Sequence, residues 1–198
     1  MLTKYIFIGI VVAVILQRLL EVRLSDRNRT EILQRGGKEH GNNLLGAVRI
    51  LQVSWYIAMI TEVWYLERPF MPVLAAFALT ATIAGQVLRY LSMQALEWRW
   101  TLPIMTVPGM PVVKSGLYRY LRHPNWLGVI LEIAFLPLIH SAYLTAIVFS
   151  LANAILMSKR IQTEEKALSE NTNYASIFAN KPRFLSITGF TRNDSSFQ

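Results

Sequence analysis

The sequence predicts an all-α integral membrane protein, and three observations support this fold class. Of the 198 residues, 53% are hydrophobic and only 16% are charged, whereas about a quarter of the residues of a soluble domain are charged. The apolar residues are gathered in long runs rather than spread evenly along the chain. The basic residues lie in clusters between alternate runs, a pattern typical of helices that cross a membrane.

Five apolar stretches are candidate membrane crossings, and they cover residues 5–20, 44–64, 70–88, 126–139 and 142–157. No small-residue cleavage site follows the first, so we expect it to be retained as an anchor and to continue as an amphipathic helix. Only a few residues separate the last two, which predicts a final helical hairpin. We expect a cytosolic C-terminal helix over residues 161–170 and a disordered tail over residues 192–198.

The basic residues predict the topology of these crossings. Of the 20 lysines and arginines, 17 lie at the end of the first, third or fifth stretch or after it; Lys4 and Arg68 flank the alternate ends, and Arg49 lies inside the second stretch. Because cytosolic loops collect basic residues, we expect the N-terminus outside and the C-terminus in the cytosol. Nucleic acid is excluded as the reason for the net charge of +8, since it would not require this alternation. Glu62 and Arg49, near opposite ends of the second stretch, are expected to be structural.

Composition also limits the chemistry and the domain organisation. The chain has no cysteine, which excludes disulfides, thiolate zinc sites and cysteine nucleophiles, and we expect no metal site. We expect one membrane domain over residues 1–198. Within it, residues 1–88 would hold three crossings, residues 89–185 the cofactor-binding and catalytic part, and residues 186–198 a tail.

The segment before the fourth stretch has the features of an anion site. Arg122 and His123 precede Pro124, a residue tolerated in the first turn of a helix, so the free N–H groups of that turn should face the cytosolic mouth. Gly128 lies one turn later and would let another group approach the backbone. Each residue alone is also explained by positive-inside arginines, a helix-starting proline and a packing glycine. Together with Glu132, they favour a ligand site.

Glu132 lies about two turns into an apolar run, where a carboxylate normally faces a partner or a polar cavity. Its partner could be an arginine such as Arg89 or Arg160. The alternative, which we favour, is a cationic or hydroxyl group of a ligand.

A second charged cluster follows the fifth stretch and contains Arg160, Glu164 and Glu165. Arg160 and Glu164 are one helical turn apart and could form a simple pair. The hairpin, however, should bring this cluster opposite Arg122 and His123 across a small gap. Acids and cations around one pocket suit a zwitterionic ligand.

Residues 116–128 (GLYRYLRHPNWLG) and residues 160–165 (RIQTEE) resemble the isoprenylcysteine carboxyl methyltransferase family, whose members are integral membrane enzymes that use S-adenosylmethionine. The resemblance covers roughly residues 86–185, and Tyr174 with residues 182–184 fits the family's tail more loosely. It implies an S-adenosylmethionine-dependent O-methyltransferase. The short chain is similar to bacterial members, which implies a plasma-membrane protein with its active site on the cytosolic side.

The resemblance also implies roles for individual residues. The cofactor would be bound by Arg122, His123, Pro124, Trp126, Leu127 and Gly128. The catalytic set would comprise Arg160, Glu164, Glu165 and Glu132. These residues would close the pocket and orient the acceptor, and a base, where one is needed, would be Glu132, Glu165 or His123. The family often has a tyrosine where this chain has Trp126, so any role of that hydroxyl is lost here.

The resemblance implies a lipophilic acceptor whose tail enters between helices while its polar head stays at the cytosolic interface. The methylated group would be the carboxyl of a prenylated cysteine-like substrate or the hydroxyl of a long-chain polyketide or phenolic lipid. A carboxylate is already a nucleophile, whereas a phenol must first lose its proton. Catalysis would consist mostly of alignment and exclusion of water. The sequence leaves both acceptors open.

Two other functions stay open. A similar RHP-N-aromatic-x-G segment occurs in NADPH-dependent membrane sterol reductases, but these tend to place an acid directly after the glycine, where this chain has Val129. A non-enzymatic scaffold or transporter should have polar residues along several crossings. Here they gather at the cytosolic ends of the last two, so methyl transfer is the favoured prediction.

Overall fold

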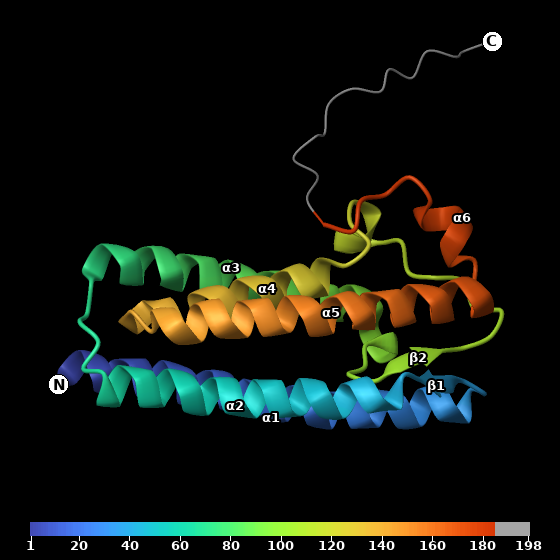
Figure 1. Ribbon diagram of the computed structural model, residues 1–198. Helices are drawn as coiled ribbons and strands as arrows, with labels where there is room; N and C mark the ends of the chain where they lie inside the picture. The colour runs from blue at the N-terminus through green and yellow to red at the C-terminus, as the bar shows by residue number, and fades with distance from the viewer. Residues whose placement is uncertain (185–198) are drawn as a thin grey trace, which may run out of the picture.

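The computed structural model describes residues 1–184, except for the side chains of residues 42 and 43, as a long bundle of helices (Figure 1). The helices are α1 (Leu2–Gln34), α2 (Asn42–Tyr65), α3 (Pro72–Leu96), α4 (Pro124–Phe135), α5 (Tyr143–Asn171) and α6 (Tyr174–Phe178). Three short 3-10 helices join them, namely η1 (Glu97–Arg99), η2 (Gly116–Arg119) and η3 (Pro137–His140). The predicted all-α class is confirmed. The tail predicted over residues 192–198 lies outside the described residues.

Four helices of the described part of the chain are long and apolar enough to cross a membrane, and they are α1, α2, α3 and α5. The fourth predicted crossing, residues 126–139, corresponds to a shorter apolar segment, Pro124–His140, which consists of α4 and η3. After it, Ser141 adopts a left-handed conformation (φ 57°) and the chain turns back into α5. The final hairpin is therefore present, with one arm shorter than the other.

The long helices form two layers (Figure 1). One contains α1 and α2, and the other contains α3, α4 and α5. Helix α4 packs against α3 and α5. Helix α5 also packs against α2, so α5 connects the two layers. The core between them, toward the end that carries Met1, includes Phe7, Val11, Trp55, Met59 and Leu136.

The outer faces of the bundle are apolar and exposed. Ile57, Phe77 and Ile147 each have about 60% of their surface uncovered, at 61%, 62% and 60% respectively. A soluble protein rarely leaves so many large apolar side chains in contact with water. Since the backbone groups between them are satisfied within helices, this surface suits a bilayer. The chain is an integral membrane protein.

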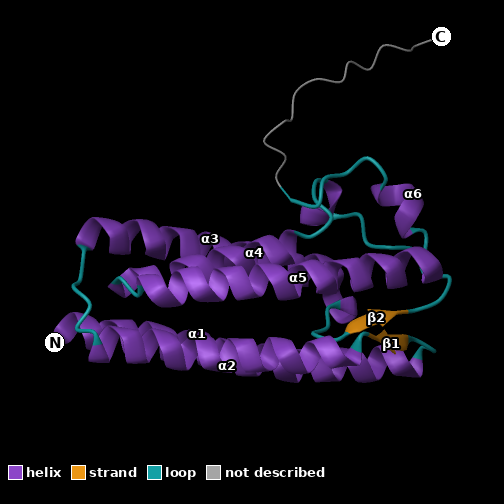
Figure 2. Cartoon of the chain, in the orientation of Figure 1, coloured by secondary structure: helices purple, strands orange, loops and turns teal. Residues whose placement is uncertain are grey.

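Two short strands, β1 (Lys38–His40) and β2 (Ile104–Thr106), pair antiparallel at the end of the bundle away from Met1 (Figure 2). These two strands were not predicted from the sequence. The ring nitrogen Nε2 of His40 lies 2.8 Å from the hydroxyl of Thr106, which ties the strands further. The pair fastens the turn between α1 and α2 to the segment that follows α3, and this segment forms one wall of the cavity described below.

At the end that carries Met1, Glu62 fixes the start of α5. Its carboxylate accepts hydrogen bonds from the backbone N–H groups of Leu144 (3.1 Å) and Thr145 (2.7 Å) and pairs with Arg68 at 2.8 Å. Unpaired N–H groups at a helix start favour an anion in this position. The structural role predicted for Glu62 is confirmed, but the side chain is only 6% exposed and is satisfied by protein groups rather than by water.

Candidate functional site

A cavity of about 430 Å³ lies between the two helical layers. Its walls come from α1, α2, α3, α4 and α5, from the segment between α3 and α4, and from α6. Its polar lining at the α6 end includes Arg122, His123, Asn125, Arg160, Glu164 and Tyr174. Its apolar lining includes Leu51, Val129, Ile133, Leu156 and Met157. The volume is that of a small-molecule site, and Arg122 and Arg160, which we expected to face each other across one gap, both line it.

The residues around the start of α4 hold the C-terminal segment, residues 174–184, in place. The backbone N–H groups of Arg122 and His123 donate to the carbonyl oxygens of Pro182 (3.0 Å) and Arg183 (3.2 Å). The Arg122 guanidinium donates through Nε to the carbonyl of Lys181 at 2.5 Å. The amides of Arg122 and His123, which flank the predicted anion site, are therefore occupied by the chain itself, and Arg122 acts first as an anchor.

Glu165 is the hub of this attachment. One of its oxygens lies 3.0 Å from Nε2 of His123 and accepts from Nε of Arg183 at 2.9 Å. The Tyr174 hydroxyl donates to the same oxygen at 3.4 Å. Burial and the neighbouring Glu165 charge raise the pKa of the Tyr174 hydroxyl, and the hydrogen bond to Glu165 raises the pKa of Arg183. Both groups therefore remain protonated donors at neutral pH.

Trp126, Glu164 and Arg160 form a second group, which lines the cavity directly. The indole N–H of Trp126 donates to Glu164 at 3.0 Å. The Arg160 guanidinium carbon lies 5.2 Å from the centroid of the Trp126 ring, and Nη2 of the same guanidinium donates to the carbonyl of Leu102. Within the described residues Arg160 does not pair with Glu164, so the simple pair considered above is not formed.

Two buried atoms on the polar wall have no hydrogen-bond partner among residues 1–184. They are the side-chain oxygen Oδ1 of Asn125, an acceptor, and Nε of Arg160, a donor. Buried polar groups are rarely left without a partner. An acceptor and a charged donor beside the Glu164 carboxylate match a ligand that carries both donors and acceptors.

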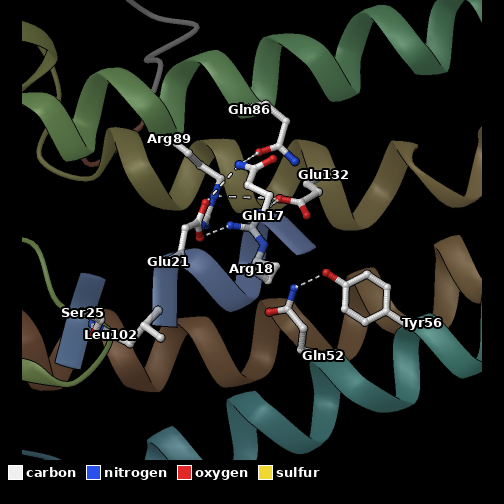
Figure 3. Close-up of polar contacts among 10 residues, drawn as sticks. All are labelled: Gln17, Arg18, Glu21, Ser25, Gln52, Tyr56, Gln86, Arg89, Leu102 and Glu132. Carbon is white, nitrogen blue, oxygen red and sulfur yellow. Dashed lines mark hydrogen bonds and ion pairs between the residues drawn. The ribbon is translucent and has the colours of Figure 1, made fainter. Parts of the chain in front are cut away.

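Glu132 lies in a buried ion-pair cluster (Figure 3). It pairs with Arg18 of α1, and Nε of Arg89 of α3 lies 3.9 Å from it. Among the described residues, Arg18 and Arg89 line the cavity but Glu132 does not. The geometry therefore favours the arginine alternative over the ligand contact that we predicted, because Arg18 pairs with one carboxylate oxygen and the other, Oε1, belongs to a residue outside the described cavity lining.

Three of the predicted cofactor residues are not part of the described cavity lining, namely Pro124, Leu127 and Gly128. They lie in the first turns of α4 and contribute to its structure. Pro124 begins the helix, as predicted. A Cβ added to Gly128 would lie 2.6 Å from both the carbonyl oxygen of Gly85 and Cγ of Arg89. Gly128 thus lets α3 and α4 pack closely, as small residues do in membranes. The packing alternative fits this glycine better than the predicted cofactor contact.

The residues that α1 and α2 contribute to the cavity lining were not predicted from the sequence. Arg18 and Glu21 of α1 line the cavity, and so do Gln52 and Tyr56 of α2. The signal was present in their spacing, since each pair lies three or four residues apart and so shares a helix face within an apolar stretch.

One protein family and two bacterial proteins are similar to this chain. The family model described as the isoprenylcysteine carboxyl methyltransferase (ICMT) family matches residues 77–170, from α3 to the last turn of α5. The uncharacterized protein YpbQ of Bacillus subtilis (strain 168) is 33% identical over 162 residues, which are 81% of this chain and 95% of that protein. An uncharacterized protein of Haemophilus influenzae is 28% identical over 166 residues, 83% of this chain and 96% of its own.

The matched segment contains most of the polar lining of the cavity, namely Arg122, His123, Asn125, Trp126, Arg160 and Glu164. The similarity to the relative from Bacillus subtilis extends beyond the family match at least into α2, because it covers 81% of the chain. The chain belongs to the isoprenylcysteine carboxyl methyltransferase family, a family of membrane methyltransferases.

Proposed function

We propose that this protein transfers a methyl group from S-adenosylmethionine to an oxygen atom of a lipophilic acceptor. One observation carries the proposal: Arg122 and Arg160 line a single cavity that continues to apolar side chains of the membrane helices. The polar part suits a water-soluble cofactor, and the apolar part suits a long-chain acceptor. Their continuity supports transfer from one to the other.

The residues on the polar wall fit S-adenosylmethionine. The unpaired Oδ1 of Asn125 and the Glu164 carboxylate suit its ammonium group, and the unpaired Nε–H of Arg160 suits its carboxylate. The face of Trp126 suits a sulfonium cation. When bound, the cofactor supplies an electrophilic methyl group. We assign its binding to Arg122, His123, Asn125, Trp126, Arg160 and Glu164, with Pro124, Leu127 and Gly128 acting through the shape of α4.

His123 is the best placed base for a hydroxyl acceptor. Of the three predicted candidates, Glu132 and Glu165 do not belong to the described cavity lining, whereas His123 does. Glu165 accepts from Arg183 and is therefore ionised, so Nε2–H of His123 must donate to it. This leaves Nδ1 as an acceptor, and we propose that it takes the proton of a phenol. A carboxylate acceptor would not need this step.

The C-terminal segment contributes by excluding water. Tyr174 and Phe178 line the cavity, and their rings stack with centroids 4.9 Å apart. Together with Arg122 and Glu165, which attach the segment, they cover the polar end. We propose that most of the catalytic effect comes from this enclosure and from alignment of the two reactants.

We propose that the polar end faces the cytosol of a bacterial plasma membrane and that the N-terminus lies outside. The end of the bundle with β1, β2 and α6 carries most of the basic residues, whereas Lys4 and Arg68 lie at the opposite end (Figure 1). Positive residues mark the cytosolic side.

The decisive experiment combines binding with product analysis. S-adenosylhomocysteine should raise the Tm of the purified protein in detergent, and NADPH should not. Incubation with radiolabelled S-adenosylmethionine and a membrane lipid extract should then yield a labelled lipid. Stabilisation by NADPH alone would instead favour a reductase, and no stabilisation by either together with no labelled lipid would favour a scaffold.

A further inference from the structure

The ion-pair cluster of Figure 3 links α1, α3 and α4 inside the apolar part of the bundle. Glu21 accepts hydrogen bonds from Gln17 (3.0 Å), from Arg18 and from Arg89 (2.5 Å). Arg18 also pairs with Glu132, and Arg89 lies 3.9 Å from it. Two arginines and two carboxylates make the cluster neutral as a whole.

One side of this cluster belongs to the cavity. Arg18, Glu21 and Arg89 line it from α1 and α3, and Gln52 and Tyr56 line it from α2. The side chains of Arg18 and Arg89 are only 13% and 6% exposed, and neither Nε–H has a hydrogen-bond partner among residues 1–184. Nε2 of Gln52 donates to the Tyr56 hydroxyl at 3.2 Å, which leaves the hydroxyl proton free to donate in turn.

A cluster that served only to stabilise the fold would not need charged groups with unpaired donors beside a cavity. Apolar side chains of similar volume are often as stabilising as a buried ion pair, and charges inside a membrane usually mark a polar pathway or ligand. The surrounding wall is apolar, with Val22, Leu51 and Ile133. In the cluster, the carboxylate oxygen Oε1 of Glu132 also has no partner among residues 1–184, but Glu132 is not part of the described cavity lining. The unused groups that belong to the lining, on Arg18, Arg89 and Tyr56, are donors, so they suit an oxygen acceptor, and the two arginines disfavour a cation.

We propose that Arg18, Arg89 and Tyr56 form a subsite that binds an oxygen atom of a single-chain amphiphile, such as a carboxylate or phenol oxygen, while Glu21 and Glu132 hold the guanidinium groups in position. The inference rests on the proposed function in that this amphiphile is the methyl acceptor. The new element of the proposal is that residues of α1, α2 and α3 recognise the acceptor, and that they lie further into the apolar part of the bundle than the polar wall assigned to the cofactor.

The test measures binding of three probes to the purified full-length protein in detergent by its tryptophan fluorescence. Pentadecylresorcinol and hexadecanoate carry oxygen, whereas pentadecylbenzene has a comparable chain without it. Arg18→Lys keeps the charge but removes Nε–H, and Tyr56→Phe removes only a hydroxyl. Each variant should bind at least one oxygen-bearing probe about three- to tenfold more weakly, the effect of one hydrogen bond, and bind pentadecylbenzene as the wild type does.

Gln86→Leu is the matched control. Gln86 accepts from Gln17 at 2.9 Å in the same cluster but is not among the described residues that line the cavity, so its loss should leave all three affinities unchanged. Wild-type affinity for both oxygen-bearing probes in Arg18→Lys and Tyr56→Phe would overturn the subsite. The Tm shift by S-adenosylhomocysteine is measured in the same samples. Its absence from the wild type, with oxygen-selective binding intact, would overturn the proposed function and still support the subsite.

Discussion

At the scale of single residues, Trp126 shows how this chain departs from the family pattern without losing a contact. The tyrosine that is common at this position would offer a hydroxyl, whereas the indole N–H of Trp126 donates to Glu164 at 3.0 Å. The larger ring also lies 5.2 Å from the Arg160 guanidinium, close enough for a cation–π contact. A donor is thus retained, and aromatic surface is added.

Trp126→Phe should weaken binding of S-adenosylhomocysteine about fivefold, because it removes a hydrogen bond worth ~1 kcal/mol and leaves Glu164 without its partner. Isothermal titration calorimetry in detergent measures this change. Trp64→Phe is the control, since Trp64 is 40% exposed at the far end of the bundle, and it should bind as the wild type does. Equal affinity of Trp126→Phe and the wild type would remove Trp126 from the cofactor site.

At the scale of elements, side-chain contacts of the C-terminal segment converge on the Glu165 carboxylate. Glu165→Ala should abolish methyl transfer and make residues 174–184 sensitive to protease, because His123, Tyr174 and Arg183 lose their common acceptor. The expected loss of stability is about 2–3 kcal/mol, typical of hydrogen bonds to a charged group. Glu170→Ala is the control, since the Glu170 side chain is 61% exposed and loses only an ion pair with Lys166, whose atoms lie 3.9 Å apart. Full activity of Glu165→Ala would show that the segment needs no such hub.

The contact between α3 and α4 gives a second prediction at this scale. Gly128→Ala should destabilise the protein by about 1–3 kcal/mol, because the new methyl group would lie 2.6 Å from the Gly85 backbone oxygen, which cannot yield as a side chain can. A lower Tm in detergent reports the effect. Gly46→Ala in α2, with nothing within 4 Å of its added Cβ, should not lower the Tm. An unchanged Tm for Gly128→Ala would mean that α3 and α4 can move apart without loss of stability.

The sequence was sufficient for those features that local pattern determines. Apolar length located the helices, and Pro124 marked the start of α4. The helix predicted over residues 161–170 is present, but as the last part of α5 rather than as a separate helix. The partner of Glu132 was not accessible in this way, because Arg18 lies 114 residues away in the chain. A costly charge can be recognised locally, whereas its neutralising partner depends on how the helices pack.

The same limit explains the other differences. Gly128 is compatible with either a ligand or a neighbouring helix, and only the position of Gly85 decides between them. The strand pair of residues 38–40 and 104–106 joins two connections that are each too short to be read as strands alone. The shared cavity of Arg122 and Arg160 could be anticipated because the hairpin between α4 and α5 follows from sequence alone.

At the scale of the whole molecule, the absence of cysteine makes the topology directly testable. Two exposed positions suit single cysteine substitutions: Glu67, in the turn between α2 and α3, and Lys114, before η2. In intact cells a membrane-impermeant maleimide should label Glu67→Cys at once and Lys114→Cys only after permeabilisation. The reverse pattern would place the cavity's polar end outside and exclude a cytosolic cofactor.

Chain order has a consequence for how this protein matures. Every membrane helix precedes the residues that bond to the backbone of Arg122 and His123, which are Pro182 and Arg183. During synthesis the lipid-facing walls are therefore complete while the polar end still lies open to water. On the proposed function, we therefore expect a chain already embedded in the bilayer to gain methyl-transfer activity only when these late residues have docked.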